Sequence, residues 1–271
     1  GLVKFDFLGL KTLTVLTKAV ELVKRGRGIE IDLLALPFDD KPSYELLAKA
    51  DTAGVFQLEG TGMRESLKRL KPDRFEDIVA LVALYRPGPM DLIPEFIRRK
   101  HGGRVDYPDP RVEPILKPTY GIMVYQEQVM QMAQLGGGYS LGGADLLRRA
   151  MGKKLPEEMA QHRGLFVKGA QGNAIDERKA NDMFDLMEKF AGYGFNKSHS
   201  TAYALIAYMT AYLKAHYSVE FMAALLSGDI PGRNFNTKDA LVEHLEDCER
   251  MNITVVPPSV NTSDVDFAVQ D

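Results

Sequence analysis

The chain has 271 residues, 45% hydrophobic and 26% charged, with a formal net charge of −3 at pH 7, which is typical of a globular protein and favours one large domain or two modest ones. A single cysteine, Cys248, excludes an internal disulfide framework and a cysteine-rich zinc site, and indicates a reducing, cytoplasmic compartment. No apolar run reaches the roughly 18 residues that a membrane span needs, and Lys4 and Asp6 interrupt the first apolar stretch, so neither a membrane partner nor a secretory signal is expected.

The hydrophobic pattern predicts a mainly α protein with a short strand at its N-terminus and small β elements elsewhere. Residues 3–7 alternate in the way that a strand does. Apolar residues then recur at helical spacing, which predicts helices over 10–24, 42–50, 62–70, 75–85 and 92–100. The proline-containing stretch 101–119 predicts a loop, and 122–125 predicts a strand.

The second half of the chain is predicted to be almost wholly helical. Helices are expected over 126–135, 141–151, 156–171, 176–191, 199–216, 218–226 and 237–250. The Pro-Gly dipeptide at 231–232 marks a joint before the last of them. A final short strand is predicted over 253–256.

Basic residues are concentrated in two clusters on a chain that is nearly neutral overall. The first cluster consists of Arg98, Arg99, Lys100 and Arg104, and the second of Arg148, Arg149, Lys153 and Lys154. Such clusters can bind phosphate groups. The alternative is that each cluster is a solvated helix face without a ligand. The sequence alone leaves both interpretations open.

The N-terminal strand carries a pair of opposite charges on one face. Side chains alternate along a strand, so Lys4 and Asp6 point to one side while the apolar residues between and around them point to the other. A carboxylate beside an ammonium group can hold a metal ion or a phosphate. The alternative is a half-buried strand whose polar face meets solvent.

The helix predicted over 141–151 ends in the second basic cluster. Ser140 can cap the start of this helix. Cations on a rigid helix suit a polyanion better than they suit a single carboxylate. The alternative is local pairing, because Asp145 stands four residues before Arg149, and because cations near a helix C-terminus also interact favourably with its dipole.

The segment 192–200 predicts a turn followed by the start of a helix. Its two glycines allow the turn, and either Asn196 or Ser198 can cap the helix. A helix N-terminus with a cation beside it is a candidate anion site. The candidate residues are Asn196, Lys197, Ser198 and His199. The P-loop pattern fails because Asn196 stands where glycine is required. Alanines on one side of the helix indicate close packing more than base stacking; they are Ala204, Ala207, Ala211 and Ala215.

Six blocks of the sequence resemble the alpha subunit of bacterial DNA polymerase III, a C-family replicative polymerase. They occur in the order of that family and run nearly from end to end of the chain. The blocks are VKFDFLGL (3–10), GVFQLE (54–59), ALYRPGP (83–89), YGIMVYQEQVM (120–130), LLRRAMGKK (146–154) and FAGYGFNKSHS (190–200). The resemblance implies an internal piece, with 1–9 as the C-terminal strand of an incomplete palm, 10–230 as the fingers domain, and 231–271 as an outer segment that leads toward the clamp-binding module.

The resemblance also implies a DNA-directed DNA polymerase, a nucleotidyltransferase that adds deoxynucleotides to a primer on a template and releases pyrophosphate. Such enzymes hold two Mg²⁺ ions with three palm aspartates. Asp6 matches the third aspartate and is the expected catalytic metal ligand, and Lys4 matches a lysine near the nucleotide phosphates. The other two aspartates belong to an earlier strand that does not precede Asp6 in this sequence, so the chain alone is expected to be inactive.

The phosphate contacts and the partners follow from the same resemblance. The residues expected to face the triphosphate are Arg148, Arg149, Lys153, Lys154, Asn196, Lys197, Ser198 and His199. The expected partners are primer–template DNA and deoxynucleoside triphosphates, together with the sliding clamp and other replisome subunits in the full-length protein. Two alternatives remain open: a non-catalytic helical protein that binds nucleic acid or acts as a scaffold, and a nucleotide-binding hydrolase.

Overall fold

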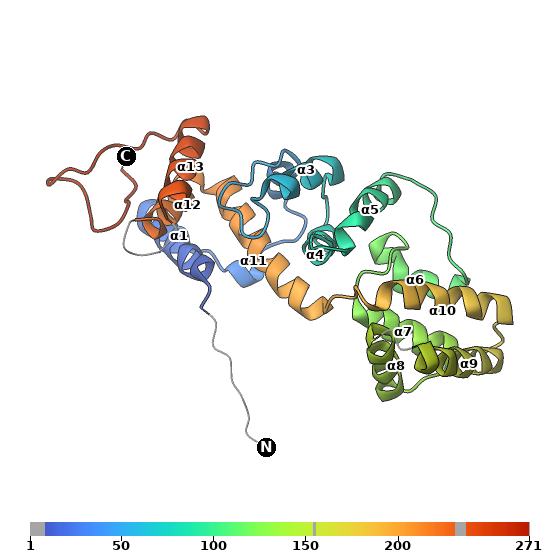
Figure 1. The fold of residues 1–271 in the computed structure, drawn as a ribbon. Helices are drawn as coiled ribbons and strands as arrows, with labels where there is room; N and C mark the ends of the chain where they lie inside the picture. The colour runs from blue at the N-terminus through green and yellow to red at the C-terminus, as the bar shows by residue number, and fades with distance from the viewer. Residues whose placement is uncertain (1–8, 154–155, 231–236, 271) are drawn as a thin grey trace, which may run out of the picture. The chain divides into compact units, whose positions relative to one another are not determined.

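The computed structural model describes residues 9–153, 156–230 and 237–270, and its regular structure is almost entirely helical (Figure 1). The prediction of a mainly α protein is therefore confirmed. The chain divides into two compact units. Unit 1 draws on residues up to 74 and from 205 onward, and unit 2 comprises residues 75–204. Each predicted helix is found, with ends that differ from the expected ones by at most three residues.

Unit 1 is built from the first and last helices of the chain. They are α1 (Lys11–Arg27), α2 (Lys41–Ala48), α3 (Thr61–Leu70), the second part of α11 (Lys197–His216), α12 (Ser218–Gly228) and α13 (Thr237–Arg250), with a short 3₁₀ turn η1 (Leu33–Ala35). The buried residues of α1 lie at helical spacing and form one stripe; they are Val15, Leu16, Ala19 and Val23. This stripe packs along α12, whose Phe221 and Leu226 are fully or almost fully buried.

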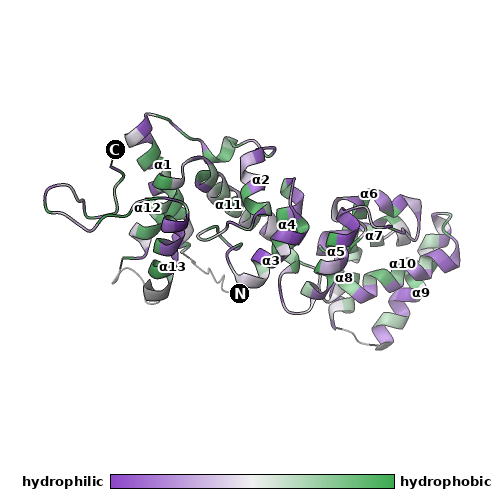
Figure 2. Ribbon diagram, turned by 90° about the horizontal axis from the view of Figure 1, so that it is seen from above, coloured by the Kyte–Doolittle hydropathy of each residue, from purple (hydrophilic) through white to green (hydrophobic). Residues whose placement is uncertain are grey.

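Unit 2 contains the middle of the chain. Its helices are α4 (Phe75–Leu84), α5 (Ile93–Lys100), α6 (Glu113–Leu116), α7 (Gln126–Gly137), α8 (Leu141–Lys153), α9 (Pro156–Gly172), α10 (Glu177–Ala191) and the first part of α11, with 3₁₀ turns η2 (Pro89–Leu92), η3 (Pro110–Val112) and η4 (Lys117–Thr119). Helices α7 to α10 pack around one core that includes Met132, Phe166 and Phe184. Figure 2 shows green apolar and purple polar stretches alternating along the helices of both units, as expected when each helix buries one face.

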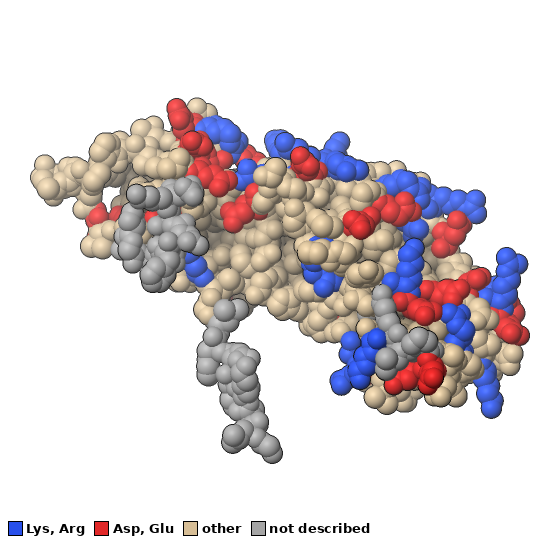
Figure 3. All heavy atoms as spheres, in the orientation of Figure 1, with Lys and Arg blue, Asp and Glu red and all other residues tan. Residues whose placement is uncertain are grey.

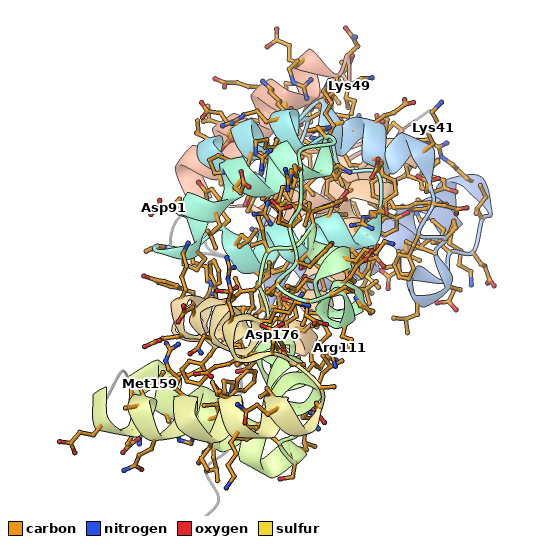
Figure 4. All side chains as sticks on the ribbon, turned by 90° about the vertical axis from the view of Figure 1, so that its right-hand side faces the viewer. Lys41, Lys49, Asp91, Arg111, Met159 and Asp176 are labelled. Atoms are coloured by element: carbon orange, nitrogen blue, oxygen red, sulfur yellow. The ribbon has the colours of Figure 1, made fainter. Side chains whose placement is uncertain are left out.

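Two glycines allow α7 and α9 to cross closely. A Cβ added to Gly169 of α9 would lie 2.0 Å from the carbonyl oxygen of Gly137 in α7, so no larger residue fits there without a shift of backbone. After the C-terminus of α9, Arg111 Nη1 donates to the carbonyl of Asn173 at 2.6 Å. Asp176 then caps α10. Figure 4 labels Arg111 and Asp176, which lie close together where α9 gives way to α10.

Helix α11 contributes to both units. Its alanines Ala204, Ala207 and Ala211 are completely buried, and Ala215 is partly buried. The prediction that this face serves close packing is confirmed. None of the described helices has the length and apolar character that crossing a bilayer requires.

The strand predictions that fall on described residues are wrong. Residues 122–125 are mostly irregular, and the β pairing found among the described residues is a single isolated parallel bridge between Tyr125 and Phe195. Residues 253–256 also lack a ladder partner within the described part of the chain. Both segments are apolar and β-branched, but a strand forms only where a second strand lies beside it. The expected strand at the N-terminus falls almost wholly on residues 1–8, outside the described residues.

The loop predicted over 101–119 is partly wrong. This stretch contains η3, α6 and η4, and each of the three begins with a proline in its first two positions. Proline is compatible with the first turn of a helix because the N–H it lacks has no helical partner there. Prolines that indicate a loop therefore also mark three short helical turns. The boundaries expected for the palm, fingers and outer segments come from the resemblance to the polymerase family, and they differ from the boundaries of the two compact units. They stay a prediction.

Candidate phosphate-binding site

The turn before α11 is fixed against the start of α7, within unit 2. The backbone N–H of Phe195 donates to the Val124 carbonyl at 3.0 Å, and the Phe195 carbonyl accepts from the Gln126 N–H at 3.0 Å. A Cβ added to Gly194 would stand 3.2 Å from the backbone of Gln126, so the two segments approach closely at a glycine. The first residues of α11 thus have a defined position next to α7.

Asn196 caps α11. Its Oδ1 accepts from the backbone N–H of His199 at 2.8 Å, which satisfies one of the donors that a helix start leaves without a partner. Of the two caps that the sequence allows, Asn196 is the one used. Ser198 is exposed and makes no capping contact in the described structure.

A carboxylate of the chain itself lies at the start of α11. Both oxygens of Glu127 accept from the backbone N–H of Lys197, at 3.1 and 3.0 Å, and Asn196 Nδ2 donates to the same carboxylate at 3.3 Å. The positive end of the helix favours an anion at this point. The anion site expected here stays a prediction, and in this structure the Glu127 carboxylate lies at the start of the helix.

The side chains around this helix start combine cations with aromatic rings. Lys197 Nζ lies 5.5 Å from the centroid of the Tyr125 ring. The imidazole of His199 stacks on Tyr203 with centroids 4.4 Å apart and meets Phe195 edge-on at 5.4 Å. Both Lys197 and His199 are exposed. The Lys197 ammonium and the exposed His199 ring, next to the start of the helix, are suited to a phosphate attached to a base.

The arginines of α8 are paired locally. Arg148 Nη2 and Arg149 Nε each lie 2.8 Å from the carboxylate of Asp145. The hydrogen bond from Arg148, with the charges of both arginines, lowers the pKa of Asp145 below its ordinary value. The local pairing that the sequence left open is confirmed. This pairing leaves positive charge accessible on α8, because the Arg149 side chain is 65% exposed and Lys153 is also exposed.

The cations of α8 lie on the surface of unit 2. Figure 3 shows Lys and Arg side chains gathered over α8. Ser140 caps this helix as expected, with its Oγ accepting from the Gly143 N–H at 3.1 Å. Helix α8 packs on α7, whose first turn supplies the glutamate at the start of α11. The two predicted groups of phosphate-binding residues thus both border α7.

The residues of the first basic cluster are paired with acidic partners, Arg104 with Asp106 at 2.8 Å. Arg98 and Arg99 share Glu95 at 2.7 and 2.6 Å, and their hydrogen bonds lower the pKa of that carboxyl to about 2. Lys100 is buried with Asp77, at 2.7 Å, so it belongs to the core and not to a solvated face.

Sequence reasoning missed a buried amide that supports the site. Gln128 Oε1 accepts from the backbone N–H groups of Val124 and Tyr125 at 2.8 and 2.9 Å, and its Nε2 donates to Thr119 Oγ1 at 2.8 Å. These bonds hold the segment that pairs with Phe195. Glu127 and Gln128 both lie in the block at 120–130 that resembles the polymerase family, and this could have marked them as important. Their spacing in the sequence does not indicate which backbone groups they bind.

No metal centre is formed by the residues that the structure describes, since no three His, Cys, Asp or Glu side chains among them are arranged to hold an ion. The expected catalytic residues, Lys4 and Asp6, lie outside the described residues, and so does Lys154 of the second basic cluster.

Comparison of the sequence with models of known protein families identifies the family of this chain. The model of the bacterial DNA polymerase III alpha subunit finger domain matches residues 12–174. The chain belongs to this family. The finger-domain match ends before α10 and α11, but similarity to whole alpha subunits continues through them.

Three alpha subunits illustrate this similarity. The DNA polymerase III subunit alpha of Xylella fastidiosa strain 9a5c is 58% identical over 269 residues, covering 97% of this chain and 22% of that protein. Those of Pseudomonas aeruginosa and Escherichia coli K12 are 54% and 51% identical over 283 residues, each covering 100% of this chain and 24% of the relative. The chain thus spans about a quarter of the length of the alpha subunits that it matches.

Proposed function

We propose that this chain is the nucleotide-facing fingers part of a replicative DNA-directed DNA polymerase. The full-length polymerase would catalyse the templated addition of deoxynucleotides to the 3′-end of a primer, with release of pyrophosphate. The observation that carries the proposal is the exposed start of α11, where a capped helix N-terminus, the Lys197 ammonium and the His199 ring stand together. Family membership supports the same conclusion.

The site acts by neutralising phosphate charge. Lys197, Ser198 and His199, with the Asn196 cap, offer the triphosphate a cation and hydrogen-bond donors at a helix start. The α8 group adds Arg148, Arg149, Lys153 and Lys154. Contacts of this kind position a nucleotide but do not read its base, because pairing with the template supplies the sequence.

The remaining roles rest on the resemblance of residues 3–10. Asp6 is the proposed third catalytic carboxylate and a ligand of Mg²⁺, and Lys4 a neighbour of the phosphates. Magnesium ions would polarise the reacting phosphate and activate the primer hydroxyl. The proposed partners are primer–template DNA, deoxynucleoside triphosphates and, for the full-length protein, the sliding clamp and other replisome subunits in the cytoplasm.

The test uses the full-length alpha subunit that carries this sequence. Lys197→Ala should raise the KM for the incoming nucleotide in single-nucleotide primer extension, while Lys168→Ala, which removes an exposed lysine of α9 in the same unit, should leave it unchanged. Equal nucleotide KM in both variants would contradict the proposal. Nucleotide hydrolysis without a primer would favour the hydrolase, and binding of nucleic acid without any turnover would favour the non-catalytic scaffold.

A further inference from the structure

Arg86 connects two turns of unit 2 that lie far apart in the sequence. It follows α4, and its Nε donates to the Ala83 carbonyl at 2.8 Å. Its Nη2 donates to the carbonyl of Tyr193, in the turn that precedes α11. The planar guanidinium thus bridges two backbone carbonyls at once, which fixes the distance between the two turns.

The same two turns also touch through rings and a glycine. The Arg86 guanidinium carbon lies 4.5 Å from the centroid of the Phe195 ring, a cation–π geometry. The ring of Tyr193 packs on Gly88, since a Cβ added there would stand 2.8 Å from Tyr193 Cε1 and the glycine has φ +96°. The turn at 193–195 is therefore held by Arg86 from one side and by the Tyr125 bridge from the other.

The charge of Arg86 has no acidic partner among the described residues. By contrast, Arg98, Arg99 and Arg148 of the same unit each pair with a carboxylate. Arg86 is partly buried, and burial lowers the pKa of its guanidinium from the ordinary value. A desolvated cation is costly without a counter-ion, so this one relies on two carbonyl dipoles and a ring face. A lysine ammonium, which has no planar fork, cannot reproduce that arrangement.

The turn at 193–195 leads directly into the proposed nucleotide contacts. Phe195 is in edge contact with His199, and the next residue, Asn196, caps α11. We propose that Arg86 is a positioning residue for nucleotide incorporation, which fixes this turn and thereby the placement of Lys197 and His199. The inference rests on the proposed function of the α11 start. Arg86 acts through these residues and does not touch the nucleotide.

The experiment is a double-mutant cycle in the full-length alpha subunit. Arg86→Lys, Lys197→Ala and the double variant are compared in single-nucleotide primer extension, with primer–template affinity and thermal melting measured on each protein. Arg98→Lys is the matched control, because Arg98 lies in the same unit and forms its ion pair with Glu95 at the surface. Arg86→Lys should raise the nucleotide KM roughly tenfold, since misplacement of a contact is costly, while primer–template affinity stays within about twofold because it rests on many other phosphate contacts.

The cycle distinguishes the possible results. If Arg86 acts through Lys197 and His199, the Arg86→Lys substitution should raise the KM by a smaller factor once Lys197 is removed, because only its effect through His199 remains. Fully additive effects would show a direct or independent role and overturn the inference, as would an unchanged KM in Arg86→Lys. An unchanged KM in Lys197→Ala would instead overturn the proposed function, and with it the inference.

A second variant covers the case in which Arg86→Lys does not fold at the assay temperature. Phe195→Leu removes the ring beneath the guanidinium and keeps an apolar side chain of similar size. It should raise the nucleotide KM in the same direction by a smaller factor. A Phe195→Leu protein with normal melting and normal KM would overturn the inference.

Discussion

The carboxylate of Glu127, in the first turn of α7, accepts from the backbone N–H of Lys197 in the first turn of α11, at 3.0 and 3.1 Å. This contact joins two helix starts and places a fixed negative charge where an anionic ligand would be attracted. We expect this carboxylate both to brace the two helix starts and to compete with an anionic ligand.

Removing the charge of Glu127 separates these two effects. Glu127→Gln keeps an oxygen that can accept from the Lys197 N–H but loses the negative charge. We expect the nucleotide KM of the full-length polymerase to fall roughly fivefold, because one unit charge a few ångströms away is worth about 1 kcal/mol near water. Single-nucleotide primer extension at constant ionic strength measures it. Glu157→Gln, at an exposed position of α9, is the control. A rise in KM would mean that the carboxylate acts as a brace only.

Arg148→Ala and Lys197→Ala in the intact enzyme should raise the nucleotide KM more than they weaken DNA binding. Each lost charge-assisted phosphate contact should cost about 1.5–3 kcal/mol. The effect of Arg148→Ala should be smaller, because Asp145 already neutralises part of its charge. Nucleotide titrations in primer extension give the comparison. Unchanged kinetics in both variants would leave only helix capping and ion pairing as their roles.

Asp6→Asn in the full-length enzyme should abolish nucleotide incorporation and leave primer–template affinity nearly unchanged. A metal ligand acts mainly on the chemical step, whereas DNA affinity comes from many phosphate contacts. Rapid-quench incorporation and fluorescence anisotropy on the same preparation measure the two quantities. Turnover near that of the unsubstituted enzyme would remove Asp6 from the active site.

The 271-residue chain alone should not extend a primer but should bind nucleotides or nucleic acid weakly. Asp6 by itself cannot supply the several oxygen ligands that each magnesium ion needs. The proposed phosphate contacts of α8 and α11 both lie in unit 2 and are expected to persist. Binding should weaken steeply between about 50 and 200 mM salt as counterions are released. Extension by a contaminant-free preparation contradicts the first half of this prediction, and salt-independent binding contradicts the second.

Unit 1 should lose stability in acid through a buried ion pair. Lys214 Nζ lies 2.7 Å from Asp247, and both side chains are almost inaccessible. Burial alone would raise the pKa of Asp247, but hydrogen bonds from Lys214 and Arg250 bring it below its ordinary value. A carboxyl whose pKa is lowered by folding contributes stability above its unfolded pKa, near 3.9. That stability disappears as the pH falls through the folded value.

Asp247→Asn should therefore lower the free energy of unfolding at pH 7 by about 3 kcal/mol, because it leaves Lys214 buried without its counter-charge. The variant should also show a flatter loss of stability below about pH 4 than the unsubstituted protein. Urea unfolding followed at several pH values measures both effects. Lys214→Met combined with Asp247→Leu should recover most of the loss, and a double variant as unstable as the single one would argue against the ion-pair explanation.

The sequence by itself determined the features that depend on neighbours within one or two helical turns. Helical periodicity predicted the positions of the helices. Short polar side chains before them predicted the cap Ser140, and they left Asn196 and Ser198 as the two candidates for the cap of α11. The pairing of Asp145 with Arg149 is also local, because residues four apart lie on one helix face. The six blocks of characteristic residues were enough to indicate the family.

Only the tertiary structure decided which of the expected groups are free to act. Glu127 reaches Lys197 across 70 positions of sequence, and Arg86 reaches Tyr193 across 107. The strand predicted over 122–125 became instead one side of a single bridge to Phe195. Such contacts depend on how helices cross after they have formed, and periodicity carries no information about the crossing partner. For this reason the sequence could propose a location for the site, but it could not show that Glu127 contacts Lys197 or that Arg86 contacts Tyr193.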